Sequence, residues 1–410
     1  MEPETQNGGP SVVKTVVWLV VLLLIVGGFV LYGSKGKGGE KVSKEPIKIG
    51  LMVPLTGDGA VYGEPARNIS QLAVEEINSS GGIGGRNIEL VIEDSKCNGK
   101  DATNAAQKLI NVDQVQVIIG GFCSSESLAT VPFATEKKVA LFSPGSSSPD
   151  LTGISPYFFR NYPSDASQGK ILAEFAFNQK GWKTIAFMQE QTDYALGIYK
   201  IFASTFEGLG GKIIKEEAPS NTTDFRSQLA KLKAVKADAL FVDTQTPAVA
   251  ERIFKQVQDL KWTIPLIAND VVAGDPKIVE TYKALLEGML TAEFGIDPTN
   301  QKFVSMIAAY KAKYGTEPPF QGYAQTEYDA VYMLRDGIIA VGYSGEKIAQ
   351  WSRTVKNWEG ASGKITIEQS GDRASGHVLK VVKEGKVEVL LETPKTEVKE
   401  EANTETGGTQ

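Results

Sequence analysis

The fold is indicated most clearly by residues 115–151, which read VQVIIGGFCSSESLATVPFATEKKVALFSPGSSSPDL. Apolar runs at 115–119 and 139–142 each lead into a loop rich in serine and glycine, and a helical stretch separates them. In a parallel α/β sheet both loops emerge at the carboxyl ends of their strands, where ligands bind. Helix N-termini there offer free N–H groups to an anion, and hydroxyls both donate and accept hydrogen bonds. The pattern indicates a site for a small zwitterion. The alternative is that these serines and prolines only cap helices and close turns.

Strands and helices alternate on both sides of this stretch. Before it, the hydrophobic periodicity predicts strands at 47–53 and 88–92 and helices at 64–78 and 102–112. A second series follows Asp165, with strands at 184–188, 213–215, 239–242 and 265–268 and helices at 171–177, 194–209, 225–235 and 248–260. The βαβα order with short connections predicts an α/β fold with two doubly wound, parallel-sheet lobes. Later segments are expected to be shared between the lobes, namely helices at 300–314 and 326–341 and strands at 363–367 and 378–383.

Composition argues against several classes of function. The chain has 410 residues, a net charge of −6 and a single histidine, His377. It has no basic block, so we expect no nucleic-acid partner. One histidine excludes multi-His metal sites and leaves no partner for a hydrolytic triad, and no nucleophile elbow, Walker loop or C-x-x-C occurs. The glycines of 81–85 follow a helical pattern rather than a strand, so they indicate a helix stop and not a dinucleotide loop. We therefore predict no catalytic residues, no metal and no cofactor.

The N-terminal segment has the composition of a membrane anchor. Residues 15–32 contain no charge, and Trp18 and Tyr32 lie near their ends, as interfacial aromatics do. Residues 1–14 form a polar tail, and residues 33–46 form a Gly/Lys-rich tether. The alternative is a cleaved signal peptide, but no A-x-A-like site follows. We expect an uncleaved transmembrane signal-anchor.

The lysines and the cysteines predict opposite membrane orientations, and we follow the cysteines. The lysines would place the large domain in the cytoplasm, because Lys14 precedes the span and Lys35, Lys37, Lys41 and Lys44 follow it. Cys97 and Cys123 each lie at the end of a predicted strand, and neighbouring parallel strands would bring these loops together. We expect a disulfide between them and an extracytoplasmic domain, the alternative being two unrelated buried thiols. Residues 393–410 lack apolar anchors and are expected to be disordered.

Four further residues are candidates for the site. Asp270 follows the strand at 265–268, where its carboxylate could pair with an ammonium or cap a helix. Tyr62, Tyr194 and Tyr323 are expected in loops at or near strand ends, as ligand contacts or as local packing.

From Ile47 to about Leu391 the chain resembles the type I periplasmic binding proteins, specifically the leucine/isoleucine/valine-binding branch of ABC importers. The resemblance rests on a combination of short motifs, which are Pro54-Leu55-Thr56-Gly57 with Tyr62-Gly63, Glu76-Ile77-Asn78 before Gly81-Gly82-Ile83, Glu93-Asp94 before Cys97, Gly121-Phe122-Cys123-Ser124-Ser125, Ser143-Pro144-Gly145-Ser146-Ser147, Pro149-Asp150-Leu151, and Phe159-Arg160 with Asp165 and Gln168-Gly169. It implies lobe 1 at 47–165 plus 293–375 and lobe 2 at 166–292 plus 376–392. A three-strand hinge would cross near 163–167, 292–295 and 371–378.

The resemblance also implies roles in the site. Ser124 would bind the ligand α-carboxylate, and the α-ammonium would be held by the Gly145 carbonyl, the Ser147 hydroxyl and Asp270. Ser146, within the same motif, and Gln245 would contact the ligand as well. Aromatic walls would fall on Tyr62, Tyr194 and Tyr323, and the Cys97–Cys123 disulfide is implied again.

Two positions depart from the pattern of the family. Asp270 is one methylene shorter than the usual Glu, and the loop at 243–246 has Gln245 nearest to an expected tyrosine. These changes make the side-chain pocket more polar. The expected function is capture of a small amino acid, branched-chain or related, by a monomeric extracytoplasmic protein that delivers it to an ABC importer permease. The alternative is the sensory domain of a signalling system with the same fold.

Overall fold

A computed structural model describes residue 16 and residues 45–391 of the chain. The predicted polar tail, nearly all of the anchor and tether, and the predicted C-terminal tail lie outside these residues. No helix in the described part is long and apolar enough to cross a membrane.

The first sheet contains five parallel strands in the order β2-β1-β3-β4-β5. They are β1 (Ile47–Val53), β2 (Ile88–Asp94), β3 (Val117–Ile119), β4 (Ala140–Ser143) and β5 (Phe158–Arg160). Every residue of β3, β4 and β5 is buried, because helices cover both faces of the sheet. This burial explains why these strands read as continuous apolar runs rather than as alternating patterns.

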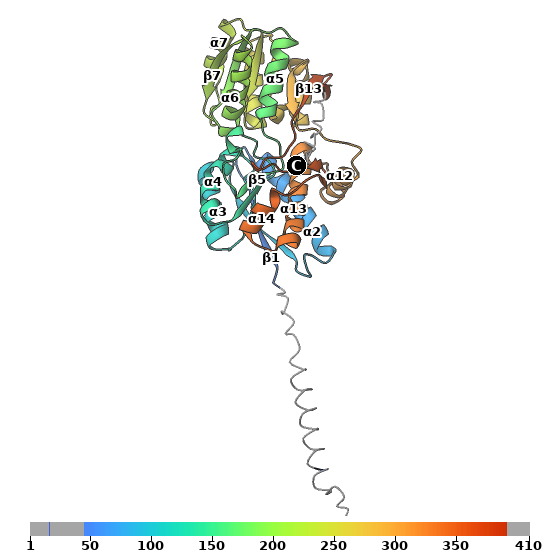
Figure 1. The fold of residues 1–410 in the computed structure, drawn as a ribbon. Coiled ribbons are helices and arrows are strands. Elements are labelled where there is room, and N and C mark those ends of the chain that lie inside the picture. Colours follow the sequence, from blue (N-terminus) through green and yellow to red (C-terminus); the bar gives the residue numbers. More distant parts are fainter. Residues whose placement is uncertain (1–15, 17–44, 392–410) are drawn as a thin grey trace, which may run out of the picture. The chain divides into compact units, whose positions relative to one another are not determined.

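Helices from both ends of the described chain complete this first lobe (Figure 1). They are α2 (Ala60–Ser79), α3 (Gly99–Asn111), α4 (Ser124–Glu136), the short 3₁₀ helix η1 (Pro149–Leu151), α12 (Gln301–Tyr314), α13 (Gln321–Val341) and α14 (Gly345–Ser352), with a hairpin of β11 (Trp358–Gly360) and β12 (Gly363–Ile365). Helix α13 packs against α2, and the Tyr314 hydroxyl donates to the Asn68 carbonyl at 3.1 Å. Segments more than 240 positions apart therefore share one core.

The second sheet has the order β14-β13-β10-β9-β8-β6-β7. Its strands are β6 (Thr184–Glu190), β7 (Lys212–Ala218), β8 (Ala239–Asp243), β9 (Leu266–Ala268), β10 (Leu290–Glu293), β13 (Val378–Lys383) and β14 (Lys386–Leu391). The helices of this second lobe are α5 (Ala166–Asn178), α6 (Asp193–Gly208), α7 (Arg226–Ala234), α8 (Pro247–Asp259), α9 (Asp270–Ala273), α10 (Pro276–Thr281) and α11 (Lys283–Leu286).

The prediction of a purely parallel second sheet is wrong at one edge. Strand β13 runs antiparallel to β10, and β14 runs antiparallel to β13. Strand β13 is not reached by a crossover helix, because the chain returns to it directly from the first lobe. Glu384 and Gly385 then both have positive φ, of 51° and 73°, as a two-residue hairpin turn requires.

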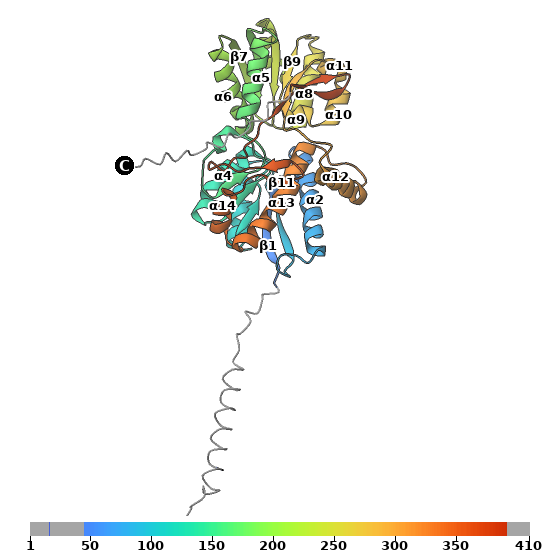
Figure 2. The ribbon, with the colours of Figure 1, turned by 45° about the vertical axis from the view of Figure 1, so that its right-hand side comes forward.

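The chain passes between the two sheets three times within the described residues, after β5, after β10 and before β13. Figures 1 and 2 show the sheets in separate lobes. The glycine-rich turn at 81–85 confirms the predicted helix stop, since α2 ends at Ser79 and four of these glycines have positive φ. At Gly82 a Cβ would lie 2.1 Å from the Arg86 carbonyl oxygen, so a side chain is excluded there.

Candidate functional site

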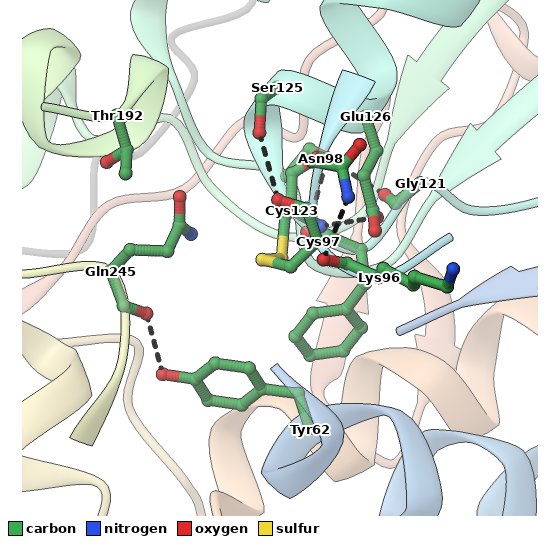
Figure 3. Close-up of a disulfide and its surroundings, with 12 residues drawn as sticks. Tyr62, Lys96, Cys97, Asn98, Gly121, Cys123, Ser125, Glu126, Thr192 and Gln245 are labelled. Atoms are coloured by element: carbon green, nitrogen blue, oxygen red, sulfur yellow. Dashed lines mark hydrogen bonds between the residues drawn. A yellow bond between two sulfur atoms is a disulfide. The ribbon is translucent and has the colours of Figure 1, made fainter. Parts of the chain in front are cut away.

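The predicted disulfide is present between Cys97 and Cys123, whose Cα atoms lie 5.3 Å apart (Figure 3). It joins the loop after β2 to the loop before α4 at the carboxyl edge of the first sheet. The expectation that β2 and β3 are direct neighbours is wrong, because β1 lies between them. The bridge therefore reaches across the end of β1 and fixes two loops of the same edge.

Ser124 is the first residue of α4 and is 1% exposed. Its Oγ accepts a hydrogen bond from the Ser148 N–H at 3.1 Å, which ties the two serine-rich loops together. The loop before α4 is braced by Glu126, whose carboxylate accepts the Cys123 N–H at 2.9 Å. Burial raises the pKa of Glu126 to about 7. The N-terminus of α4 is thus held in place beside the Ser124 hydroxyl.

The residues of the loop at 145–148 make different contacts. Gly145 lines a cavity between the lobes, and a Cβ there would lie 3.1 Å from the Phe122 ring. The Ser147 side chain is buried and lies against the Asp165 carboxylate. The Ser146 hydroxyl donates to the Gly121 carbonyl at 2.8 Å, which is a bracing contact within lobe 1. Neither Ser146 nor Ser147 is among the residues that line this cavity.

Arg160, at the end of β5, supports the same loop and was not predicted to do so. Its Nη1 donates to the carbonyls of Ser146 and Ser148, at 3.2 and 2.9 Å. Its Nε donates to Asp372 Oδ1 at 2.7 Å, so the buried guanidinium is paired. These hydrogen bonds hold the main chain on either side of Ser147 in place.

Asp270 is 2% exposed and accepts hydrogen bonds from three tyrosines. The hydroxyls of Tyr162 and Tyr323 each donate to Oδ2 at 2.8 Å, and the Tyr194 hydroxyl donates to Oδ1. The alternative of a helix cap is not realised, because Asn269 occupies the N-cap position of α9. Asp270 belongs to the second lobe, whereas Tyr323 belongs to α13 of the first. The carboxylate is therefore a contact point between the lobes.

The predicted tyrosines lie in the first turns of helices rather than in loops: Tyr62 in α2, Tyr194 in α6 and Tyr323 in α13. Burial raises the pKa of each well above its usual value, and the negative charge of Asp270 raises it further. All three phenols are consequently neutral donors at physiological pH.

Other buried carboxyl groups surround Asp270. Burial raises the pKa of Asp165 and of Asp243 well above the usual range, and nearby carboxylates add to the effect in both cases. Burial also raises the pKa of Glu190, to about 6. His377 Nε2 lies 3.5 Å from Asp165 Oδ1, and burial lowers the pKa of this histidine to about 4. The raised pKa values favour the neutral forms of Asp165 and Asp243, and the lowered pKa of His377 leaves no protonated histidine beside Asp270 at neutral pH.

A small cavity brings together six of the predicted site residues, Tyr62, Ser124, Gly145, Tyr194, Gln245 and Tyr323. Phe122, Cys123 and Val271 also line it. The Tyr62 hydroxyl donates to the Gln245 carbonyl at 3.0 Å, which links the lobes directly across the cavity (Figure 3). Arg252 and Asp58 form an ion pair across the same cleft at 3.2 Å. The lobes are therefore in a closed arrangement. Asp270 is not among the residues that line this cavity.

In residues 45–391 no cluster of three or more His, Cys, Asp or Glu side chains has the geometry to hold a metal ion.

A family described as periplasmic binding protein matches residues 46–383. The chain belongs to this family. A curated relative, the leucine-, isoleucine-, valine-, threonine- and alanine-binding protein of Pseudomonas aeruginosa, is 27% identical over 84% of this chain and 91% of its own length.

Two solved structures extend the comparison. The leucine-binding protein LivK of Thermotoga maritima is 30% identical, with a TM-score of 0.78 over 85% of this chain and 99% of its own. LivJ of Streptococcus pneumoniae, a branched-chain amino acid transporter substrate-binding protein solved in complex with isoleucine, is 27% identical, with a TM-score of 0.75 over 84% and 98% of the two chains. The fold is therefore that of the type I periplasmic binding proteins.

The sequence does not assign a role in the site to three further residues. Tyr162 donates to Asp270, Phe122 stacks on Tyr62 with ring centroids 5.4 Å apart, and Asp165 lies against Ser147. Phe122 follows the strand predicted at 115–119, and that position is a signal that could have identified it. Tyr162 and Asp165 follow β5, which the apolar pattern does not predict as a strand.

Proposed function

We propose that the chain is an extracytoplasmic substrate-binding protein that captures a free α-amino acid between its lobes and delivers it to an ABC importer permease. The observation that supports this most strongly is the buried Asp270 carboxylate of the second lobe, which accepts the hydroxyl of Tyr323, a residue that lines the same interlobe cavity as Ser124 at the N-terminus of α4. The relatives support it as well, since their names describe binding of leucine, isoleucine, valine, threonine or alanine.

The zwitterion has a matching set of groups in this proposal. The ligand carboxylate accepts hydrogen bonds from the Ser124 hydroxyl and from N–H groups at the start of α4, where the helix dipole favours an anion. The ligand ammonium lies against Asp270, the Gly145 carbonyl and the Ser147 hydroxyl. The two charged groups of an α-amino acid are only ~2.5 Å apart, so both sets of contacts are made at once.

Transport then requires closure and not chemistry. The lobes, at 47–165 plus 293–375 and 166–292 plus 376–392, rotate about the three crossings as rigid bodies. Because Ser124 is on one lobe and Asp270 on the other, a bound amino acid stabilises the closed form. The closed form is the one that the permease recognises. The protein acts as a monomer and is anchored to the cytoplasmic membrane by residues 15–32.

A thermal-shift screen of the purified full-length protein against free amino acids tests this function. Ligand at one hundred times its Kd should stabilise the folded state by about 2.7 kcal/mol. The N-acetyl derivative of the same amino acid is the control, since it lacks the ammonium and should not stabilise the protein. If no free amino acid stabilises the protein, or if the N-acetyl form does so equally, the proposed function is wrong.

A further inference from the structure

Polar side chains gather at the end of β8 and in the loop that leads to α8. Asp243 ends β8, a central strand of the second sheet, and Thr244, Gln245 and Thr246 follow it; all four side chains are buried. Gln245 is 8% exposed and lines the interlobe cavity.

The main chain of Gln245 is fixed from both sides. Its N–H donates to Glu190 Oε2 at 2.7 Å, and its carbonyl accepts the Tyr62 hydroxyl at 3.0 Å. With the backbone held in this way, the side chain extends toward Thr192, across from the Cys97–Cys123 disulfide (Figure 3).

The Gln245 amide oxygen has no hydrogen-bond partner among the described residues. The same is true of the hydroxyls of Thr244 and Thr246. Buried polar atoms are nearly always paired in folded proteins, so an unpaired carboxamide that lines a binding cavity indicates a partner supplied by the ligand. An aliphatic side chain would leave this oxygen unpaired and buried, whereas a hydroxyl or carboxamide would satisfy it.

The surroundings of Gln245 favour a short and neutral partner. Glu190 lies beside it, and its carboxylate would repel an acidic side chain while already accepting the Gln245 N–H. The rings of Tyr62, Phe122 and Tyr323 pack with centroids 5.2 to 6.0 Å apart, which leaves little room for a long cationic chain.

We propose that the preferred ligand is an α-amino acid with a short, neutral, hydrogen-bonding side chain that pairs with the Gln245 carboxamide. This inference rests on the proposed function and narrows its substrate class. The aromatic rings contact the carbon atoms of the ligand side chain, and Gln245 selects its polar end. A site built to pair a polar group discriminates strongly against the isostere that lacks it.

Isosteric ligand pairs test the inference by titration calorimetry on the full-length protein. Threonine is compared with valine, and asparagine with leucine, with lysine and arginine as cationic probes. We expect the polar member of at least one pair to bind about tenfold or more tightly than its apolar isostere. In Gln245→Leu this preference should fall to about twofold or less, or reverse. Gln350→Leu, at an exposed position on α14, is the matched control and should keep the wild-type ratio.

The possible outcomes separate this inference from the proposed function. If amino acids bind but valine and leucine bind at least as tightly as their isosteres, the inference is overturned and the proposed function stands. Tightest binding by lysine or arginine overturns it as well, as does a Gln245→Leu variant that keeps the wild-type ratio. If no amino acid binds, both are wrong. The wild-type pairs decide the question even if Gln245→Leu does not fold, which circular dichroism would reveal.

Discussion

Glu327 is a buried carboxyl group in α13 that takes no part in the proposed ligand contacts. It is 0% exposed, and its Oε1 accepts a hydrogen bond from the Ser70 hydroxyl of α2 at 2.5 Å. Burial raises the pKa of Glu327 to about 8, against 4.5 for an ordinary glutamate. The folded protein therefore keeps this proton at neutral pH, whereas the unfolded chain releases it.

The raised pKa predicts a pH-dependent effect of Glu327→Gln. Well below pH 4.5, Glu327 is protonated in both the folded and the unfolded wild type. As the pH rises toward 8, Glu327 ionises only in the unfolded chain, so the wild type loses stability. The variant does not titrate, so its free energy of unfolding should improve relative to wild type by on the order of 3 kcal/mol between pH 5 and pH 8. Denaturant unfolding at both pH values measures the difference. Exposed Glu207→Gln is the control, and an equal effect of Glu327→Gln at both pH values would contradict the prediction.

The sequence predicts those site residues that lie at the carboxyl ends of strands, such as Ser124, Gly145 and Asp270. It does not predict Tyr162, because the partner of its hydroxyl is 108 positions away on the other lobe. Nor does it predict the bracing role of Ser146, since the direction of a serine hydroxyl depends on which backbone carbonyls surround it.

At the scale of elements, the start of α2 depends on the absence of a side chain at Gly63. A Cβ at this position would lie 1.9 Å from the Pro54 carbonyl oxygen at the end of β1. The close approach of helix and strand also positions the neighbouring Tyr62, which reaches across to Gln245.

We therefore expect Gly63→Ala to destabilise the protein by about 1–3 kcal/mol, because a backbone atom must move to accept the methyl group. Gly208→Ala at the end of α6 is the matched control, since a Cβ there meets nothing within 4 Å. It should be neutral or stabilising by up to about 1 kcal/mol. Thermal unfolding of both variants measures the contrast, and equal stabilities would show that the contact at Gly63 is not restrictive.

Long periodic elements were predictable, and short ones were not. The helices at 301–314 and 321–341 correspond to those predicted at 300–314 and 326–341, and most strands of both sheets follow from their apolar patterns. Strands β5, β10 and β14 are not predicted. Helices α9 and α11 have four residues each, too few for a helical period to appear in the sequence. The start of α2 was predicted at residue 64 and lies at Ala60, because the glycines at 57, 59 and 63 suggest a loop.

At the scale of the whole molecule, the two lobes meet through contacts that converge on the cavity. Asp270 of lobe 2 accepts the Tyr323 hydroxyl of lobe 1, and the Tyr62 hydroxyl of lobe 1 donates to the Gln245 carbonyl of lobe 2. At the rim, Lys200 of α6 pairs with Asp150 of η1 at 2.5 Å. The rim pair is half-exposed and contributes little, so the lobes are held together mainly by the buried contacts.

The central claim is that an α-amino acid bridges Ser124 and Asp270, and calorimetric titration of the full-length protein tests it most directly. The amino acid identified by the screen is titrated into wild type, Asp270→Ala, Ser124→Ala and the exposed control Asp259→Ala. Removing Asp270 leaves a buried ammonium unpaired, so binding should weaken by at least ~2 kcal/mol, or about thirtyfold. Ser124→Ala should weaken binding less, because N–H groups at the start of α4 still contact the carboxylate, and Asp259→Ala should bind as wild type does. If Asp270→Ala binds the amino acid as tightly as wild type, Asp270 does not hold the ammonium and the account of the site is wrong.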